Sequence, residues 1–128
     1  MNEFHVIIHA VDHDEHKLSP SVTAGSGKFG CSFEDVSDAF EKLPRMFLEP
    51  DGSFVWVIEK NGSRSQLDGL LTDDGTHLLH CELKGQCCGE TLDQLLTTLG
   101  WPKQAVHFQL IQEGVFLSEE EFRKRFEF

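Results

Sequence analysis

Two carboxylates and one lysine, carried by two neighbouring predicted strands, are the residues of this chain best suited to chemistry. Asp68 lies on one strand, and Glu82 and Lys84 lie on the next, after the tight turn Asp73-Asp74-Gly75. Carboxylate oxygens are the hard ligands that Mg²⁺ and Mn²⁺ prefer, and the bound metal polarises a phosphoryl group and lowers the pKa of its water. A nearby ammonium group stabilises the attacking hydroxide and the developing negative charge. The set is therefore suited to a metal-dependent reaction at phosphorus.

The predicted pairing of these two strands brings the three side chains within reach of one another. Side chains alternate between the faces of a strand, so Asp68 shares a face with Gln66, and His80, Glu82 and Lys84 share a face. The turn places Asp68 opposite His80, and a shift of two residues would place Asp68 opposite Glu82. The alternative interpretation is a solvated charged face of an amphipathic hairpin, in which Lys84 neutralises Glu82.

This spacing resembles a known nuclease motif. Asp68, thirteen intervening residues and then Glu82-Leu83-Lys84 are similar to the PD-(D/E)xK motif, and the predicted elements over residues 32–112 follow the order of that superfamily's core. The resemblance implies that Asp68 and Glu82 are metal ligands, that Lys84 is the catalytic lysine, and that Mg²⁺ or Mn²⁺ is the cofactor. It also implies that the backbone carbonyl of Leu83 is a further ligand.

The chain differs from this family at several positions. Leu67 precedes Asp68 where the motif name has proline, and the third acidic ligand is left open between Glu34 and Glu41 of the first predicted helix. Some members of the family have a functional glutamine on the helix that follows the motif. Gln94 is near that position, but it lies opposite the leucine stripe of its own helix, so we expect it to face solvent and assign it no role.

The whole chain also resembles small bacterial proteins of unknown function, a resemblance that implies no activity. The segments that carry it are Asp51-Gly52-Ser53-Phe54-Val55-Trp56, Gln66-Leu67-Asp68-Gly69, Glu82-Leu83-Lys84-Gly85 and Phe108-Gln109-Leu110.

The elements that must position these residues are predicted from hydrophobic periodicity and capping signals. Ser32 with Asp35, and Ser118 with Glu121, have the spacing of capping boxes that begin helices. Asn61-Gly62 is a strong hairpin signal. The predicted strands are 4–11, 54–58, 65–72, 77–84 and 105–112, and the predicted helices begin at 32, 90 and 118 and include 90–99.

The expected fold is α/β with a mixed sheet flanked by helices. Three strands form an antiparallel meander, and a right-handed crossover from residue 84 to residue 106 makes the fourth strand parallel to its neighbour. This order suggests a restriction-endonuclease-like core. We expect one globular domain over residues 1–128, with an N-terminal strand and loop (1–31), the core (32–112) and a C-terminal helix (113–128).

Composition limits the partners and the compartment. The net charge of −11 disfavours nucleic acid and favours a basic protein partner. No stretch is long and apolar enough to span a membrane, no signal peptide is visible, and the four cysteines lack CxxC spacing. We therefore expect a cytoplasmic protein with reduced thiols and no membrane partner.

Three further groups of residues were considered as sites. His5, His9 and His13 would share a strand face, but a spacing of four residues separates successive rings by about 13 Å, too far for one ion. Cys87-Cys88 precedes the second helix, and the vicinal pair is more simply interpreted as packed than as reactive. The segment 25–30 lacks the residues of a phosphate-binding loop.

Two function classes therefore remain. The first is a divalent-metal-dependent phosphodiesterase or nuclease-like domain, active or degenerate, with its site at Asp68, Glu82 and Lys84. The second is a non-enzymatic acidic protein-interaction module.

Overall fold

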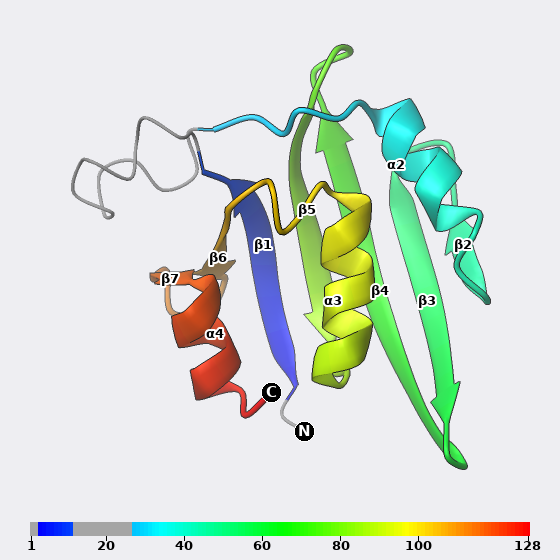
Figure 1. Cartoon of the computed structure of the whole chain (residues 1–128), viewed down its shortest axis with the longest axis vertical. Coiled ribbons are helices and arrows are strands. Elements are labelled where there is room, and N and C mark those ends of the chain that lie inside the picture. The colour runs from blue at the N-terminus through cyan, green and yellow to red at the C-terminus, as the bar shows by residue number, and fades with distance from the viewer. Residues whose placement is uncertain (1–2, 12–26) are drawn as a thin grey trace.

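The computed structural model describes residues 3–11 and 27–128, which form one seven-stranded sheet covered by helices on one face (Figure 1). The strands are β1 (Phe4–Ala10), β2 (Met46–Leu48), β3 (Ser53–Lys60), β4 (Ser63–Asp73), β5 (Leu78–Gly85), β6 (Val106–Leu110) and β7 (Phe116–Ser118). The helices are α2 (Phe33–Phe40), α3 (Gly89–Thr98) and α4 (Glu119–Arg125).

All pairs of neighbouring strands in this sheet are antiparallel. The strand order is β2-β3-β4-β5-β1-β6-β7, and β1 pairs with β5 on one side and with β6 on the other. The predicted mixed sheet, with its parallel fourth strand and restriction-endonuclease-like core, is therefore wrong. β5 and β6 do run in the same direction, as the crossover through α3 requires, but β1 lies between them and separates them.

Local capping signals position the helices where the sequence predicts them. The Ser32 side chain accepts a hydrogen bond from the Asp35 N–H and the Asp35 carboxylate accepts one from the Ser32 N–H, which is a complete capping box. The same reciprocal pair forms between Ser118 and Glu121 at the start of α4. Glutamates in the first turn of α4 and basic residues in its last turn complement the helix dipole.

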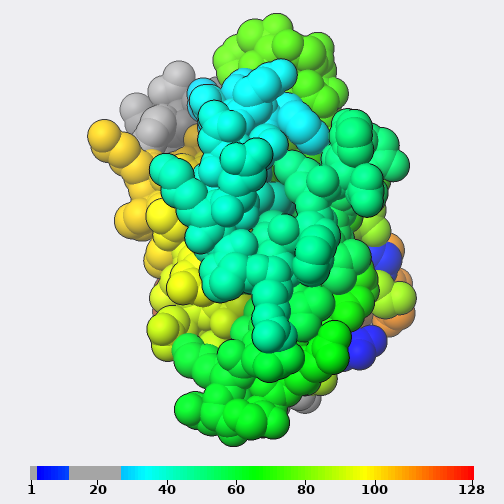
Figure 2. All heavy atoms as spheres, turned by 90° about the vertical axis from the view of Figure 1, so that its right-hand side faces the viewer, coloured from blue at the N-terminus to red at the C-terminus, as the bar shows by residue number. Residues whose placement is uncertain are grey.

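The core lies between the sheet and the three helices. Alternate residues of the central strands point into it, as shown by Val6 and Ile8 of β1, which are fully buried. α4 closes one end, where the Phe122 ring stacks on Phe108 with 4.1 Å between ring centroids. α2 closes the other end, where Phe40 meets Phe54 edge to face. Figure 2 shows this end, with α2 and the β2 segment stacked along the edge of the molecule.

We call the opposite face of the sheet, which none of the described helices covers, the open face. Its residues occupy the alternate strand positions that the core does not use. Within the described residues, no helix is long and apolar enough to cross a membrane. Of the predicted N-terminal strand and loop (1–31), residues 1–2 and 12–26 lie outside the described residues.

Candidate functional site

Asp68, Glu82 and Lys84 all lie on the open face of the sheet. Asp68 is in β4 directly opposite Lys84 in β5, and Glu82 is opposite Leu70. Both predicted registers are therefore wrong, since they placed Asp68 opposite His80 or opposite Glu82. The face is nevertheless the predicted one, because the observed register differs from each prediction by an even number of residues.

The register differs because the turn between β4 and β5 is longer than its sequence suggests. Asp73 pairs with Leu78, so four residues, 74–77, form the loop. The Asp74 carboxylate accepts hydrogen bonds from the backbone N–H groups of Thr76 and His77, and its own N–H donates to the His77 carbonyl. A bulge next to Thr72 then adds one residue to β5. The buried residue near this bulge is consequently Leu78.

Each of the two carboxylates already has a hydrogen-bond partner. Glu82 Oε2 lies 2.7 Å from His5 Nε2 of β1, and Asp68 Oδ1 accepts a hydrogen bond of 3.0 Å from Gln66 Nε2. Lys84 is exposed and makes no hydrogen bond or ion pair with another described residue. Glu82 is paired with His5 and not with Lys84. The Lys84 ammonium group therefore remains available to a ligand or partner.

The other residues considered for the metal site do not join Asp68 and Glu82. Glu34 and Glu41 belong to α2 and its C-cap, and α2 covers the opposite face of the sheet. Gln94 lies on α3, where it lines a separate cavity together with Glu90. Within residues 3–11 and 27–128, no group of three or more His, Cys, Asp or Glu side chains is arranged to hold a metal ion.

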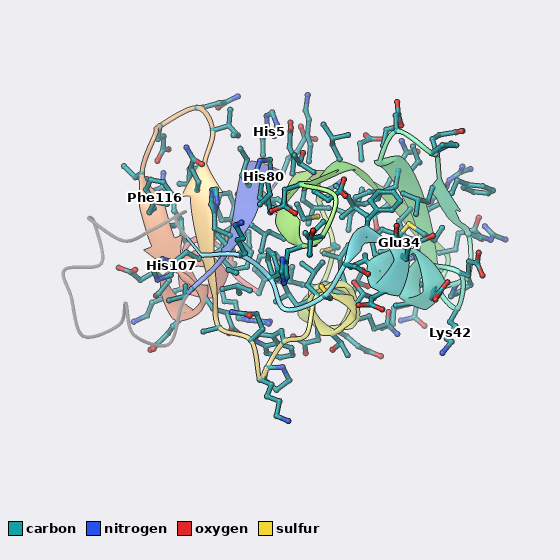
Figure 3. The ribbon with its side chains drawn as sticks, turned by 90° about the horizontal axis from the view of Figure 1, so that it is seen from above. His5, Glu34, Lys42, His80, His107 and Phe116 are labelled. Atoms are coloured by element: carbon teal, nitrogen blue, oxygen red, sulfur yellow. The ribbon has the colours of Figure 1, made fainter. Side chains whose placement is uncertain are left out.

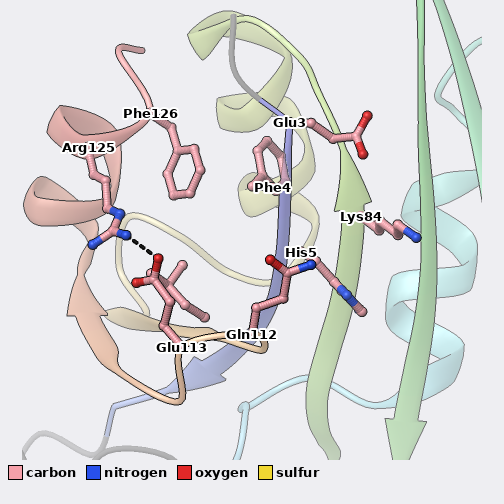
Figure 4. Close-up of a pocket in the computed structure, with 9 residues that line it drawn as sticks. Glu3, Phe4, His5, Lys84, Gln112, Glu113, Arg125 and Phe126 are labelled. Carbon is pink, nitrogen blue, oxygen red and sulfur yellow. Dashed lines mark hydrogen bonds and ion pairs between the residues drawn. The ribbon is translucent and has the colours of Figure 1, made fainter.

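Lys84 instead contributes to a cavity at one end of β1 and β6. The cavity has a volume of ≈ 390 Å³. Its lining residues are Glu3, Phe4, His5, Lys84, Leu110, Gln112, Glu113, Arg125 and Phe126. Figure 4 shows Lys84 and Arg125 on opposite sides of this space, with Arg125 paired to Glu113. The side chains of Lys84 and Arg125 therefore do not point toward a common position in the cavity. Asp68 and Glu82 are not part of its lining.

Four histidines lie on the open face, and three of them, His9, His80 and His107, are neighbours across the strands, which the sequence analysis did not predict. His5 and His9 lie on β1, and their neighbours across the strands include His80 of β5 and His107 of β6. Figure 3 shows His5 and His80 on the side of the sheet away from α3. Burial, and then the adjacent His9, lower the pKa of His80 below its ordinary value. Alternate spacing within each strand predicts the shared face, but only the strand order brings the histidines together.

The open face is nearly balanced in charge, although the whole chain carries −11. The charged strand residues on this face are three acidic ones and two basic ones, so they contribute −1 when histidine is neutral. These are Glu59, Asp68, Glu82, Arg64 and Lys84. Most of the negative charge therefore lies on the helices, the edges and the loops.

Partly exposed apolar side chains accompany these charges on the open face. They are Ile7, Phe47, Val55, Val57, Leu70 and Phe116. Phe47 is 62% exposed, and Leu70 and Phe116 are each 37% exposed. Phe47 and Val55 are opposite one another on β2 and β3, and Leu70 lies on the next strand, β4, whereas Phe116 lies on the opposite edge strand, β7. A group of exposed apolar side chains such as the first three is typical of a surface that contacts another molecule.

The vicinal cysteines before α3 have contrasting environments. Burial raises the pKa of Cys87 to about 12. Cys88 is the N-cap residue of α3, and Thr91 Oγ1 lies 3.4 Å from its Sγ, where a hydrogen bond to the thiolate lowers the Cys88 pKa. Lys60 lowers it further. The predicted packed role therefore describes the Cys87 side chain, whereas the Cys88 thiol is partly exposed.

Comparison of the chain with protein family models, with curated proteins and with solved structures finds no match in any of the three.

Proposed function

We propose that the protein is a non-enzymatic interaction module that docks a basic partner protein on the open face of its sheet. The observation that carries the proposal is the composition of this face: apolar side chains such as Phe47 and Leu70 are exposed there, and the local charge is close to zero. Burying such a face removes apolar area from water without desolvating many unpaired charges.

The dimensions of the open face suit a protein interface of ordinary size. The seven strands contain 45 residues, and each strand residue covers about 16 Å² of the sheet, because the rise is about 3.3 Å and neighbouring strands lie about 4.8 Å apart. The resulting area, on the order of 700 Å², is close to the roughly 800 Å² that each partner contributes to a stable complex. Docking on this face would therefore need no second surface.

The net charge favours a basic partner over a second copy of the chain. Nearly all of the −11 lies outside the open face, and the chain as a whole is acidic. Such a field attracts a basic protein and speeds its association, whereas it repels another copy and the phosphates of nucleic acid. The partner that fits has an apolar patch and an excess of lysine and arginine.

The proposal is tested by site-specific photo-crosslinking in cells of the source organism. A photoreactive phenylalanine analogue replaces Leu70 on the open face, and the matched control replaces Lys42, which Figure 3 shows on the side of the helices. We expect one basic protein to crosslink from position 70 and not from position 42. Equal crosslinking from both positions, no crosslink, or a crosslink to a second copy would contradict the proposal.

The crosslinked partner is then purified and its affinity measured by calorimetry at increasing salt concentration. Phe47→Ser combined with Leu70→Ser should weaken binding at least tenfold, which corresponds to about 1.4 kcal/mol. Binding should also weaken with salt, because salt screens the attraction between the negatively charged chain and a basic partner. Affinity that is independent of both changes would refute docking on this face.

A metal-dependent phosphodiesterase is the second candidate function, supported by the common face of Asp68, Glu82 and Lys84. It is tested by adding Mn²⁺ during NMR observation of backbone amides. Broadening confined to Asp68 and the 82–84 segment, abolished by Asp68→Asn and retained in the control Asp38→Asn, would justify nuclease assays on DNA and RNA. No localised response at millimolar Mn²⁺ would leave this function without its cofactor.

A further inference from the structure

Three histidines lie side by side across the middle of the open face. His9 of β1 pairs with His80 of β5 on one side and with His107 of β6 on the other. Residues directly opposite one another in antiparallel strands have Cβ atoms about 4.5–5.5 Å apart. This separation is much shorter than the spacing along β1 on which the sequence prediction relied, so the objection that the rings are too far apart does not apply across strands.

The His9 and His80 rings are close enough to share one ion. Their centroids are 5.8 Å apart and their planes make an angle of 58°. Two imidazoles that bind one metal with metal–nitrogen distances of about 2.0–2.1 Å have ring centroids separated by roughly 5–6 Å. The observed separation therefore falls within the range that chelation requires.

His9 is also held in place as metal-binding histidines are. Its Nε2 lies 2.8 Å from Gln109 Oε1, an acceptor, so Nε2 donates and neutral His9 offers its lone pair at Nδ1. His9 is only 8% exposed, and its ring lies against Phe116, with 5.7 Å between centroids. A ring fixed in this way loses little conformational freedom when it binds an ion.

We propose that His9 and His80 form a two-histidine site for a borderline transition-metal ion such as Ni²⁺ or Zn²⁺. Imidazole nitrogen suits these ions, whereas Mg²⁺ and Ca²⁺ prefer oxygen. The nearest candidate oxygen ligand on β5, Glu82, is bonded to His5. Because the described residues hold no group of three ligands, water or a group from outside these residues fills the other coordination positions.

The site is tested by adding Ni²⁺ to the full chain and following paramagnetic broadening of its backbone amides. We expect broadening centred on His9 and His80, and a calorimetric Zn²⁺ affinity that falls at least tenfold in His80→Gln. Gln109→Leu should weaken binding about tenfold or more, as expected for loss of a group that orients a ligand. The control His77→Gln changes a partly exposed histidine in the β4–β5 loop, outside the paired strands, and should bind as the unmodified chain does.

Two further variants make the assignment falsifiable. If His13→Gln with His16→Gln abolishes binding while His80→Gln does not, the ion belongs to the segment after β1 and the proposal is wrong. The same holds if broadening centres on His107, on Asp68 or on the thiols. The dispersion of the amide spectrum of each variant reports its folding, so loss of binding with an unchanged spectrum supports the site, and loss accompanied by unfolding is resolved by Gln109→Leu.

Discussion

Substitution of Gly69 by alanine should disturb both the core and the open face, because no room exists for a side chain at this position. Gly69 lies in β4 between Asp68 and Leu70 and pairs with Phe54. A Cβ atom built at Gly69 would overlap Cζ and Cε1 of the Phe54 ring and would lie 2.6 Å from the carbonyl oxygen of Glu82. Alanine can be accommodated only if the ring rotates away or β4 separates from β5.

The expected cost follows from these contacts. Overpacking of a core costs about 1–3 kcal/mol. Displacing the Phe54 ring also removes its edge-to-face contact with Phe40, whose centroid is 5.0 Å away, and such contacts contribute about 0.5–1.5 kcal/mol. Replacing glycine by alanine in a strand also stabilises the folded state by roughly 0.5–1 kcal/mol, because glycine loses more conformational entropy on folding. We therefore expect Gly69→Ala to lower the free energy of unfolding by about 2 kcal/mol.

Urea unfolding followed by the fluorescence of Trp56 and Trp101 measures this change. With a slope of about 2 kcal/mol/M, the midpoint should fall by about 1 M at an unchanged slope. In a Phe54→Leu background the cost of Gly69→Ala should become smaller without vanishing, since the contact with the Glu82 carbonyl remains. An equal cost in both backgrounds, or no cost in either, would show that the Phe54 ring does not occupy this space.

Three other outcomes are expected from single features of the structure. Iodoacetamide should alkylate Cys88 well before Cys87, because the pKa of the Cys88 thiol is lowered and that of Cys87 is raised. The rate of alkylation should rise with pH as the Cys88 thiol ionises. Mass spectrometry of digests taken at successive times measures both rates, and equal rates would contradict the expectation. Phe122→Ala should lower the free energy of unfolding by about 3–5 kcal/mol, because the ring is fully buried and stacked on Phe108; calorimetry or urea unfolding would reveal a smaller loss if the cavity collapses. Asp74→Asn should destabilise the chain at neutral pH and make its stability less dependent on acid. Hydrogen bonds from the backbone N–H groups of residues 76–77 hold the pKa of Asp74 in the folded state far below 3.8. The stability that the Asp74 carboxylate contributes is therefore present above pH 3.8 and is lost as the pH falls below 3.8. An identical fall in stability between pH 5 and pH 2 in both proteins would refute that assignment.

Local signals in the sequence predict the three described helices and the five longer strands because these signals act over only a few residues, whereas the three-residue strands β2 and β7 were not predicted. The capping boxes at Ser32 and Ser118 and the hairpin at Asn61-Gly62 are all confirmed. The position of β1 is not encoded locally: its apolar alternation is satisfied equally at an edge or in the centre of a sheet. The crossover through α3 predicts that β5 and β6 run in the same direction, but nothing in their own residues reveals that another strand separates them.

The candidate site shows the same division between local and long-range information. Alternation along β4 and β5 is sufficient to place Asp68 and Lys84 on one face, whichever even-numbered register the turn selects. The contact between His5 and Glu82, and the approach of His9 to His80, depend on the insertion of β1 and could not be predicted from the hairpin alone.

The central position of β1 also has a consequence for how the chain reaches its native state. β1 is the first described strand, yet its contacts join residues that are 77 and 100 positions apart, as for His5 with Glu82 and His9 with Gln109. The β3–β5 meander contains only local pairings and can form by itself, whereas the β6–β7 hairpin joins the rest of the sheet only through β1. Loop closure over such distances slows folding toward the millisecond-to-second range of proteins rich in non-local contacts. Until β1 inserts, the facing edges of β5 and β6 stay unpaired, so the slowest step of folding is also the one that protects the chain from pairing with another copy.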